Sequence, residues 1–356
     1  MAEVITPPAA RTVSFCSSLS DDAWLDLDGP NAFESWHFDA VSDDGREAIV
    51  IGFYDNYALS PRFYQSTGAD ERRRFPAVSL VYSVDGKAVL SSVNEFASGE
   101  FAALTGKPEC TVAASSFRVD EAGYGSGFMV TVDIRTVGGR RIHGELEWLL
   151  IESDLMPLSG GRSDATWNLV VPRADVSGKL TLIGRRGKLR KQVHFRGTGY
   201  HDHVSSRNVH YRELASRMWG RAHFADSTIV FERHGGVQDR DAPGKFFLIR
   251  DSEIHERDAA CEAAEFKRDR WGLLVPRRIT YVSDDNIRLR VKPVSRIRSD
   301  FSEVKMLSEV TLSLRDGRAR KALGITEFVD PLRMKSRLSR WISDFRIGRN
   351  GRSPLF

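Results

Sequence analysis

Residues 128–135 read FMVTVDIR and residues 142–150 read IHGELEWLL, and these two runs decide the fold class. In both, apolar side chains alternate with polar or charged ones at every second position. Successive side chains of a β-strand point to opposite faces of a sheet, whereas a helix is marked by apolar residues at intervals of three and four. The alternation therefore predicts half-buried antiparallel strands.

The same alternation returns in the second half of the chain. Residues 287–292 read IRLRVK, and residues 304–314 continue the pattern. Short turn sequences lie between such runs, with residues that tolerate positive φ: Asp85-Gly86, Gly138-Gly139 and Asp284-Asp285-Asn286. Many strands joined by tight turns predict an all-β protein, built as an antiparallel sandwich or barrel.

The two halves of the chain carry a faint repeat. Trp36 and Trp219 each precede a polar turn and a short apolar strand. At 356 residues, the chain is long enough for two domains with separate cores. We therefore expect two barrel-like β domains, at residues 20–190 and 191–356, with the boundary somewhere within residues 184–198.

The clearest helical pattern lies at residues 331–346, where Leu338, Trp341, Ile342 and Phe345 share one face. The C-terminal region is also basic, with seven Lys or Arg residues against two Asp residues. A C-terminal helix of this kind either packs its apolar face on the outside of a barrel or lies on an anionic membrane surface. Both interpretations remain open at this point.

Bulk properties favour a cytoplasmic protein. The chain has no run of 18 or more apolar residues, and its N-terminus lacks the basic start and apolar stretch of a secretory signal. The three cysteines, Cys16, Cys110 and Cys261, are far apart, as expected in a reducing compartment. A net charge of +4 is too small to indicate a nucleic-acid partner. The sequence does not define an oligomeric state.

Several familiar catalytic motifs are missing from the sequence. It contains no GxGxxG or GxxxxGK[ST] loop and no GxSxG elbow. Chemistry that depends on nicotinamide, ATP or a serine nucleophile is therefore disfavoured, and we expect no cofactor.

Residues 199–203 read GYHDH and concentrate more potential chemistry than any other stretch. In an extended strand, His201 and His203 point to one face and Asp202 to the other. Three interpretations compete: a hydrogen-bonded structural turn, a site that handles protons or orients a substrate, and a metal site. His-x-His supplies two ligands, but zinc needs a third and a fourth, and no complete set can be identified. We therefore expect no bound metal.

Three further motifs accompany this pentapeptide: ESWHFDA at residues 34–40, WNLVVP at 167–172 and MWGRAHF at 218–224. In this order and spacing, the set resembles the carotenoid 1,2-hydratase (hydroxyneurosporene synthase) family and its lipocalin-like relatives. Those relatives include the decalin-forming Diels–Alderases of fungal natural-product pathways. The resemblance covers roughly residues 30–330 and implies two lipocalin-like domains, with a pocket at or between them.

The chain departs from the hydratases at one place. Their motif continues as His-Asn-Trp-Gly, whereas here His203 is followed by Val204 and Ser205. An aromatic ring two residues after the second histidine would stabilise a developing carbocation by cation–π attraction of about 0.5–2 kcal/mol. Ser205 lacks that ring, which weakens the match to carotenoid hydratases while leaving the wider family intact.

The resemblance implies a cofactor-independent enzyme that hydrates or cyclises a C=C bond of a hydrophobic isoprenoid or polyketide. Protonating an alkene needs a strong acid, and burial in an apolar pocket holds a carboxyl group neutral. The candidate acids are Asp202, Glu232 and Glu34, and the histidines His201 and His203 would orient or reprotonate the acid. The pocket would be lined by the aromatic residues Trp36, Trp167, Trp219, Phe231 and Tyr200. A pericyclic reaction would need only shape and a hydrogen-bond donor such as Tyr200 or His203.

Each candidate also has a structural interpretation. Glu232 is also consistent with a solvated carboxylate paired with Arg233 or Arg221. Glu34 fits a carboxylate at the edge of the core that is capped by backbone donors, and the tryptophans fit core positions. The competing function is a lipocalin-like protein that carries or sequesters a hydrophobic ligand without chemistry. The two functions differ in whether the carboxyl groups face the pocket.

Overall fold

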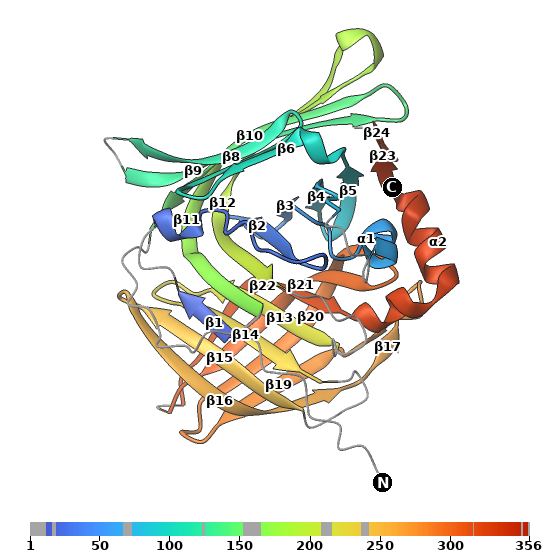
Figure 1. The fold of residues 1–356 in the computed structure, drawn as a ribbon. Coiled ribbons are helices and arrows are strands. Elements are labelled where there is room, and N and C mark those ends of the chain that lie inside the picture. The colour runs from blue at the N-terminus through green and yellow to red at the C-terminus, as the bar shows by residue number, and fades with distance from the viewer. Residues whose placement is uncertain are drawn as a thin grey trace.

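The computed structural model of the chain describes residues 12–15, 19–66, 73–122, 125–151, 165–207, 216–235, 242–315, 317–349 and 352–354. Strands dominate it and form two large bodies, and the longest helix lies near the C-terminus (Figure 1). The predicted all-β, lipocalin-like class with a C-terminal helix is confirmed. In the described part of the chain, no helix has the length and hydropathy needed to cross a bilayer.

The second half of the chain forms a closed antiparallel barrel, here called the second barrel. Its strands are β13 (Arg217–His223), β14 (Thr228–His234), β15 (Pro243–Arg250), β16 (Glu253–Ala264), β19 (Arg278–Ser283), β20 (Arg288–Ser299), β21 (Glu303–Ser313) and β22 (Ala319–Val329). They follow one another around the barrel, and β13 closes it by pairing with β22. A small hairpin of β17 (Lys267–Arg268) and β18 (Leu274–Val275) interrupts the sequence between β16 and β19.

The other strands form the first sheet. They are β1 (Thr12–Phe15), β2 (Phe33–Ser42), β3 (Glu47–Tyr54), β4 (Ala77–Val84), β5 (Lys87–Glu95), β6 (Phe101–Leu104), β7 (Lys107–Val112), β8 (Ser115–Ala122), β9 (Gly125–Thr136), β10 (Arg141–Leu150), β11 (Ala165–Ile183), β12 (Leu189–Ser206), β23 (Ile347–Arg349) and β24 (Arg352–Ser353). Pairing runs from β12 through β2, β3, β4 and β5 to β23 and β24. It continues through β9, β10 and β11 back to β12, so the first sheet also closes on itself.

The boundary between the two bodies differs from the expected one. β12, which covers residues 189–198 of the expected boundary region 184–198, pairs with β2 and β11 and belongs entirely to the first sheet. The strands of the second barrel start only at Arg217. β23 and β24 return to the first sheet and pair in parallel with β5 and β9, so residues 191–356 do not form one separate domain. Period-two patterning identifies a strand but not the sheet that it joins.

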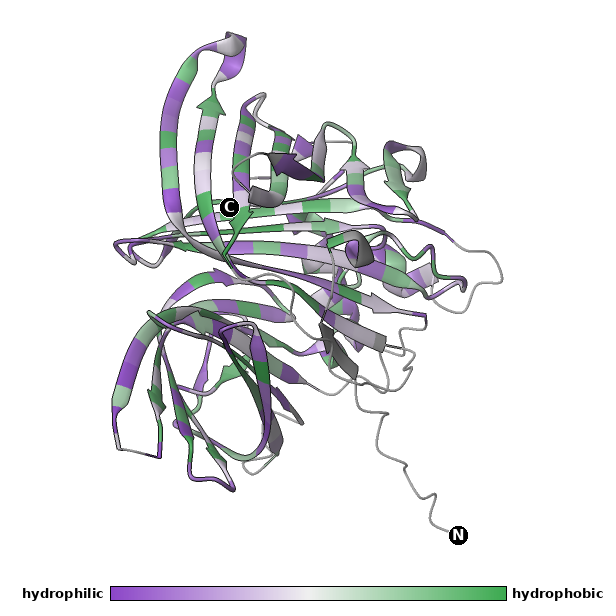
Figure 2. Ribbon diagram, turned by 90° about the vertical axis from the view of Figure 1, so that its left-hand side faces the viewer, coloured by the Kyte–Doolittle hydropathy of each residue, from purple (hydrophilic) through white to green (hydrophobic). Residues whose placement is uncertain are grey.

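Strand β9 shows how the sequence produces the core. Phe128, Val130, Val132 and Ile134 are fully buried inside the first sheet, while the side chains between them are partly exposed. Green and purple positions alternate along many strands of Figure 2 for the same reason. The predicted tight turns also hold, because Asp85, Gly139 and Asn286 all have positive φ.

The helical segments are η1 (Leu19–Asp22), α1 (Pro61–Ser66), η2 (Ser98–Glu100), η3 (Arg185–Gly187), η4 (Pro331–Lys335) and α2 (Arg337–Arg346). The predicted C-terminal helix is present as η4 and α2, and α2 packs beside α1 (Figure 1). Its orientation is the reverse of a packed amphipathic helix. Ser343 and Arg346 face inward, whereas Leu338, Trp341 and Phe345 are exposed.

Candidate functional site

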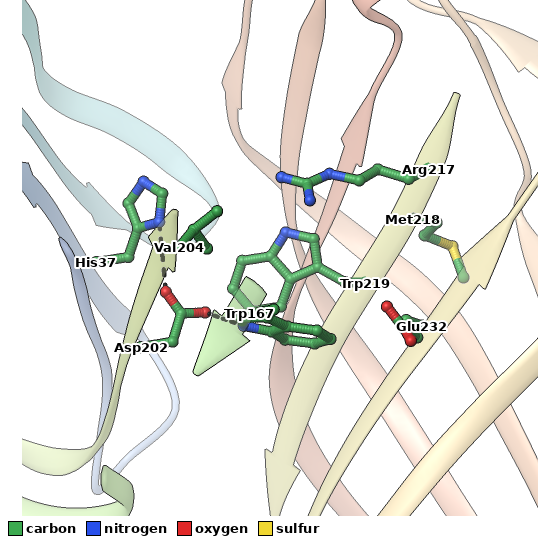
Figure 3. Close-up of a pocket in the computed structure, with 8 residues that line it drawn as sticks. All are labelled: His37, Trp167, Asp202, Val204, Arg217, Met218, Trp219 and Glu232. Carbon is green, nitrogen blue, oxygen red and sulfur yellow. Dashed lines mark hydrogen bonds and ion pairs between the residues drawn. The ribbon is translucent and has the colours of Figure 1, made fainter. Parts of the chain in front are cut away.

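The outer face of the first sheet packs against the outer face of the second barrel, and this contact encloses a small cavity, here called the interface pocket. Its walls come from β2, β11 and β12 on one side and from β13 and β14 on the other (Figure 3). The cavity measures about 10 Å³, which is room for roughly one water molecule. It is lined by His37, Trp167, Asp202, Val204, Arg217, Met218, Trp219 and Glu232.

Asp202 is the acid of the first-sheet wall. In the strand register it lies between His37 of β2 and Leu169 of β11, and its side chain is 1% exposed. Oδ2 accepts hydrogen bonds from the Trp167 indole at 2.7 Å and from the Tyr200 hydroxyl at 3.0 Å. Oδ1 accepts no hydrogen bond from the described residues. The site therefore holds a buried carboxyl oxygen that is available to a bound molecule.

His37 stands beside Asp202 and connects it to a buried hydroxyl. Its Nδ1 lies 3.5 Å from Asp202 Oδ1, and its Nε2 lies 3.2 Å from the Tyr54 hydroxyl. Burial raises the pKa of Tyr54 to about 12, so this hydroxyl keeps its proton at neutral pH. His37 belongs to the ESWHFDA motif but was not predicted as a site residue. Strand alternation could have indicated one, because it places His37 on the face opposite to Trp36.

The second-barrel wall is built around Trp219. Its ring meets that of Trp167 edge-on, with centroids 5.5 Å apart and planes at 66°. Burial lowers the pKa of the Arg217 guanidinium, although the charges of Glu232 and neighbouring glutamates act in the opposite direction. In Figure 3, the two indoles stand between Asp202 and Glu232. The pocket therefore carries a carboxyl group on each side of an aromatic pair.

A buried ion pair joins the two bodies near this pocket, and a buried lysine–glutamate cluster lies within the second barrel. Arg221 Nε donates to Asp39 Oδ1 at 2.7 Å across the contact. Lys305 lies 3.1 Å from Glu303 and also pairs with Glu327. Burial opposes the charge on Lys305, but the charges of both glutamates outweigh it and raise its pKa. These pairs were not predictable from the sequence, because charged residues that alternate with apolar ones normally face solvent.

His201 and His203 point to the interior enclosed by the first sheet and away from the interface pocket. They lie on the face opposite to Asp202, as the alternation predicted. His203 lies 3.1 Å from Glu34 and 3.2 Å from Asp22. Burial opposes protonation of His203, but hydrogen bonds to these two carboxylates, together with their charges, raise its pKa to about 9. The two ring nitrogens of His201 face Asp22 at 2.9 Å and the carbonyl of His37 at 3.0 Å.

Aromatic rings complete this inner cluster. Trp36 stacks on His203 with centroids 4.5 Å apart, and Phe38 stacks on His201 at 3.8 Å. Glu34 also accepts the backbone N–H of Leu25 at 3.0 Å, which matches the interpretation of a carboxylate capped by backbone donors. The cluster is closely packed and fully inside the first sheet.

The predicted site residues therefore divide into three groups. Asp202, Glu232, Trp167 and Trp219 line the interface pocket. Tyr200 does not line it but donates a hydrogen bond to Asp202. The inner cluster contains His201, His203, Glu34 and Trp36. These four residues do not line the interface pocket, although all the candidate residues were expected to share one pocket. Phe231 lies inside the second barrel, on the face of β14 opposite to Glu232.

Metal ligands do not converge at either place. Among the residues that the structure describes, no group of three or more His, Cys, Asp or Glu side chains is arranged to hold a metal ion. The His-x-His pair instead binds Asp22 and Glu34.

Two closed or nearly closed β bodies, packed through their outer faces around an aromatic pocket, define a two-domain lipocalin-like protein. A similar fold is found in solved structures. CghA is 15% identical with a TM-score of 0.55, and the alignment covers 84% of this chain and 88% of CghA. A complex of CghA with Sch210972 has a TM-score of 0.52. NE1406 of Nitrosomonas europaea, described as a candidate AttH protein, is 14% identical with a TM-score of 0.60, covering 92% of this chain and 99% of that one.

Sequence comparison points in the same direction. Hydroxyneurosporene dehydrogenase of Chlorobaculum tepidum is 23% identical over 351 residues, which is 93% of this chain and 91% of the relative. No family model matches the chain. Together, the full-length relative and the shared fold confirm the resemblance to the lipocalin-like hydratase and cyclase family.

Proposed function

We propose that the protein is an enzyme that protonates a C=C bond of a hydrophobic polyene, an isoprenoid or a polyketide, and so hydrates or cyclises it without a cofactor. The observation that carries this proposal is Asp202, a buried carboxyl group whose Oδ1 accepts no hydrogen bond from the described residues and lies beside His37. The Chlorobaculum relative is named for hydroxyneurosporene, a carotenoid, which supports a substrate of the polyene class.

The proton starts on the pair formed by Asp202 and His37. Transfer from Asp202 Oδ1 to one alkene carbon uses the π electrons to form a C–H bond and leaves a carbocation on the other carbon. The rings of Trp167 and Trp219 stabilise this cation through their π electrons by about 0.5–2 kcal/mol each. In hydration, water adds to the cation and releases one proton to the carboxylate, so the net change is the addition of water. In cyclisation, a second double bond attacks the cation and a neighbouring carbon returns the proton, so the net change is an isomerisation.

Substrate entry requires the pocket to open. A cavity of about 10 Å³ holds one water molecule but no part of a polyene. Trp167 and Trp219 fill the space between Asp202 and Glu232, so separation of these two rings is the movement that admits a substrate. The proposal therefore includes an opening of the contact between the first sheet and the second barrel.

A second function, a binding protein without chemistry, has one observation in its favour. Trp167 and Tyr200 both donate to Asp202 Oδ2, as expected for a carboxylate that fixes the packing of a carrier. In this case a hydrophobic ligand would bind in the opened pocket and be released without chemical change.

We place the protein in the cytoplasm and at the surface of the membrane in which such a substrate dissolves. Cys110 and Cys261 are free and buried, which is consistent with a reducing compartment. A hydrophobic polyene partitions into lipid, so an enzyme that acts on it meets its substrate at a bilayer.

The proposal is tested by offering the protein acyclic carotenoids and linear polyketide polyenes, and by following water addition or isomerisation by liquid chromatography and mass spectrometry. Asp202→Asn should lower turnover by at least about 10²-fold, the low end for loss of a general acid. Asp258→Asn, at a surface position with an 89% exposed side chain, is the matched control and should be as active as the unmodified protein. Ligand binding with no turnover by either protein would favour the carrier.

A further inference from the structure

Helix α2 presents an aromatic ridge to the outside of the molecule. Leu338, Trp341 and Phe345 are 63%, 61% and 65% exposed, and the rings of Trp341 and Phe345 touch edge-on with centroids 4.9 Å apart. The inward face of the helix is polar, because Arg346 stacks over Trp271 at 5.0 Å. Large exposed apolar side chains gathered on one helix face are typical of a docking surface.

A basic pocket lies beside this ridge. It has a volume of about 570 Å³ and is lined by Arg62, Arg73, Arg74, Phe75, Glu95, Phe96, Ala97 and Ser98. Two of its guanidinium groups are held over aromatic rings, Arg62 over Phe75 at 4.9 Å and Arg74 over Trp24 at 4.7 Å. Glu95 lies 3.5 Å from Arg62 and Asp26 lies 2.7 Å from Arg74, so the charge of these two groups is partly balanced, whereas Arg73 is exposed. The pocket therefore offers guanidinium groups that are held in place by aromatic rings and carboxylates.

The ridge and the pocket belong to one surface. Arg340 of α2 stacks over Tyr64 of α1 at 4.7 Å, and α1 also carries Arg62 of the pocket. Arg349 pairs both with Glu95 of the pocket and with Asp344 of α2. α1 and α2 stand side by side in Figure 1.

We propose that this surface docks the protein on an anionic lipid bilayer. The aromatic ridge enters the boundary between headgroups and acyl chains, as in interfacial amphipathic helices. The guanidinium groups of the basic pocket bind headgroup phosphates, which Arg contacts through two parallel hydrogen bonds. The biological purpose of docking rests on the proposed function, in which the substrate dissolves in the membrane. Docking itself can be measured without turnover.

A bilayer fits this surface better than a second copy of the chain. Arg73 and two exposed basic residues beside the ridge, Lys335 and Arg337, leave an excess of positive charge around the apolar face. In a two-fold symmetric contact the same patch meets itself, so these like charges would oppose each other. Negative headgroups complement both the charge and the apolar ridge.

The test is co-sedimentation of the full chain with vesicles of phosphatidylcholine alone and of phosphatidylcholine mixed with phosphatidylglycerol. We expect binding to the anionic vesicles to be at least about tenfold stronger and to fall as salt is raised. Arg62→Gln with Arg73→Gln should remove most of this preference. Arg288→Gln with Arg290→Gln, the same change of charge at exposed positions of the second barrel, should leave it intact.

Substitutions on the aromatic ridge show whether it binds a lipid bilayer or a second copy of the chain. Trp341→Ser with Phe345→Ser should weaken binding to both vesicle types by at least about tenfold, with unchanged thermal melting and an unchanged elution volume in gel filtration. Equal sedimentation with neutral and anionic vesicles would overturn the proposal. A dimer that this double variant dissociates would assign the ridge to a second copy, and release from vesicles by millimolar inorganic phosphate would assign the pocket to a soluble anion. Turnover of a substrate dissolved in detergent is measured separately and does not depend on vesicle binding. A failure of the docking proposal is therefore distinguishable from a failure of the proposed function.

Discussion

Replacing His203 with Gln should make the stability of the protein less dependent on pH between 6 and 9. Burial opposes the charge on His203, but Asp22 and Glu34 raise its pKa from 6.5 to about 9. A group whose pKa is raised on folding stabilises the fold fully below pH 6.5, and this contribution is lost as the pH rises through 9. The difference between the two pKa values corresponds to about 3 kcal/mol of unfolding free energy.

The measurement is urea unfolding of both proteins at pH 6 and pH 9, followed by tryptophan fluorescence. Between these pH values the unmodified protein should lose about 3 kcal/mol more unfolding free energy than His203→Gln, because all other titrating groups are shared and cancel. His255→Gln, at a position with a 45% exposed side chain, is the control and should behave like the unmodified protein. If His203→Gln and the unmodified protein show the same pH dependence, His203 is neutral in the fold and the ion cluster is wrongly assigned.

Three further predictions follow from the same geometry. Turnover by Glu232→Gln should stay within about twofold of the unmodified protein if Asp202 is the acid, and a loss of about 10²-fold would exchange their roles. Activity should survive dialysis against EDTA, whereas stoichiometric zinc that is lost together with activity would contradict this. Removing residues 347–356 should destabilise the fold by about 2 kcal/mol or more in urea unfolding, because β5 loses its pairing with β23 and β9 its pairing with β24, and unchanged stability would show that these pairings are dispensable.

Local patterns in the sequence predicted the strands and the faces of their side chains. Alternation placed Phe128 and Val130 in the core, and it placed His201 and His203 opposite to Asp202. Each of these statements depends on the geometry of one strand, which a short stretch of sequence determines. The tight turn at Asp85 was predictable for the same reason.

Long-range partners were not predictable in this way. Nothing in the pattern of β23 indicates that it inserts beside β5, since pairing between strands about 250 residues apart in the chain leaves no periodic signal. The helical pattern of α2 identified its apolar face but not the direction in which that face points. Arg221 and Lys305 alternate with apolar residues like solvent-facing charges, and only the packing of two bodies buries them.

In the candidate site, too, the residues in local motifs were predictable and those brought in by long-range pairing were not. Asp202, Trp167 and Trp219 were found because they belong to recognisable motifs. His37 was found only through its register with Asp202, and Asp22 only because η1 brings it to the two histidines. Glu34 and His203 were assigned to the same site as Asp202, but they lie on the inner face of the first sheet and do not line the interface pocket.

The central claim is that Asp202 delivers a proton to a carbon atom of the substrate, and reaction in D₂O tests it most directly. A product formed by this route should carry one solvent deuterium on carbon, whether the outcome is hydration or cyclisation. Asp202→Asn should form this labelled product at least about 10²-fold more slowly while keeping the fold and ligand binding, and Asp258→Asn should form it at the unmodified rate. Product formed by the unmodified protein without any carbon-bound deuterium, or labelled product formed by Asp202→Asn at the unmodified rate, would contradict the account.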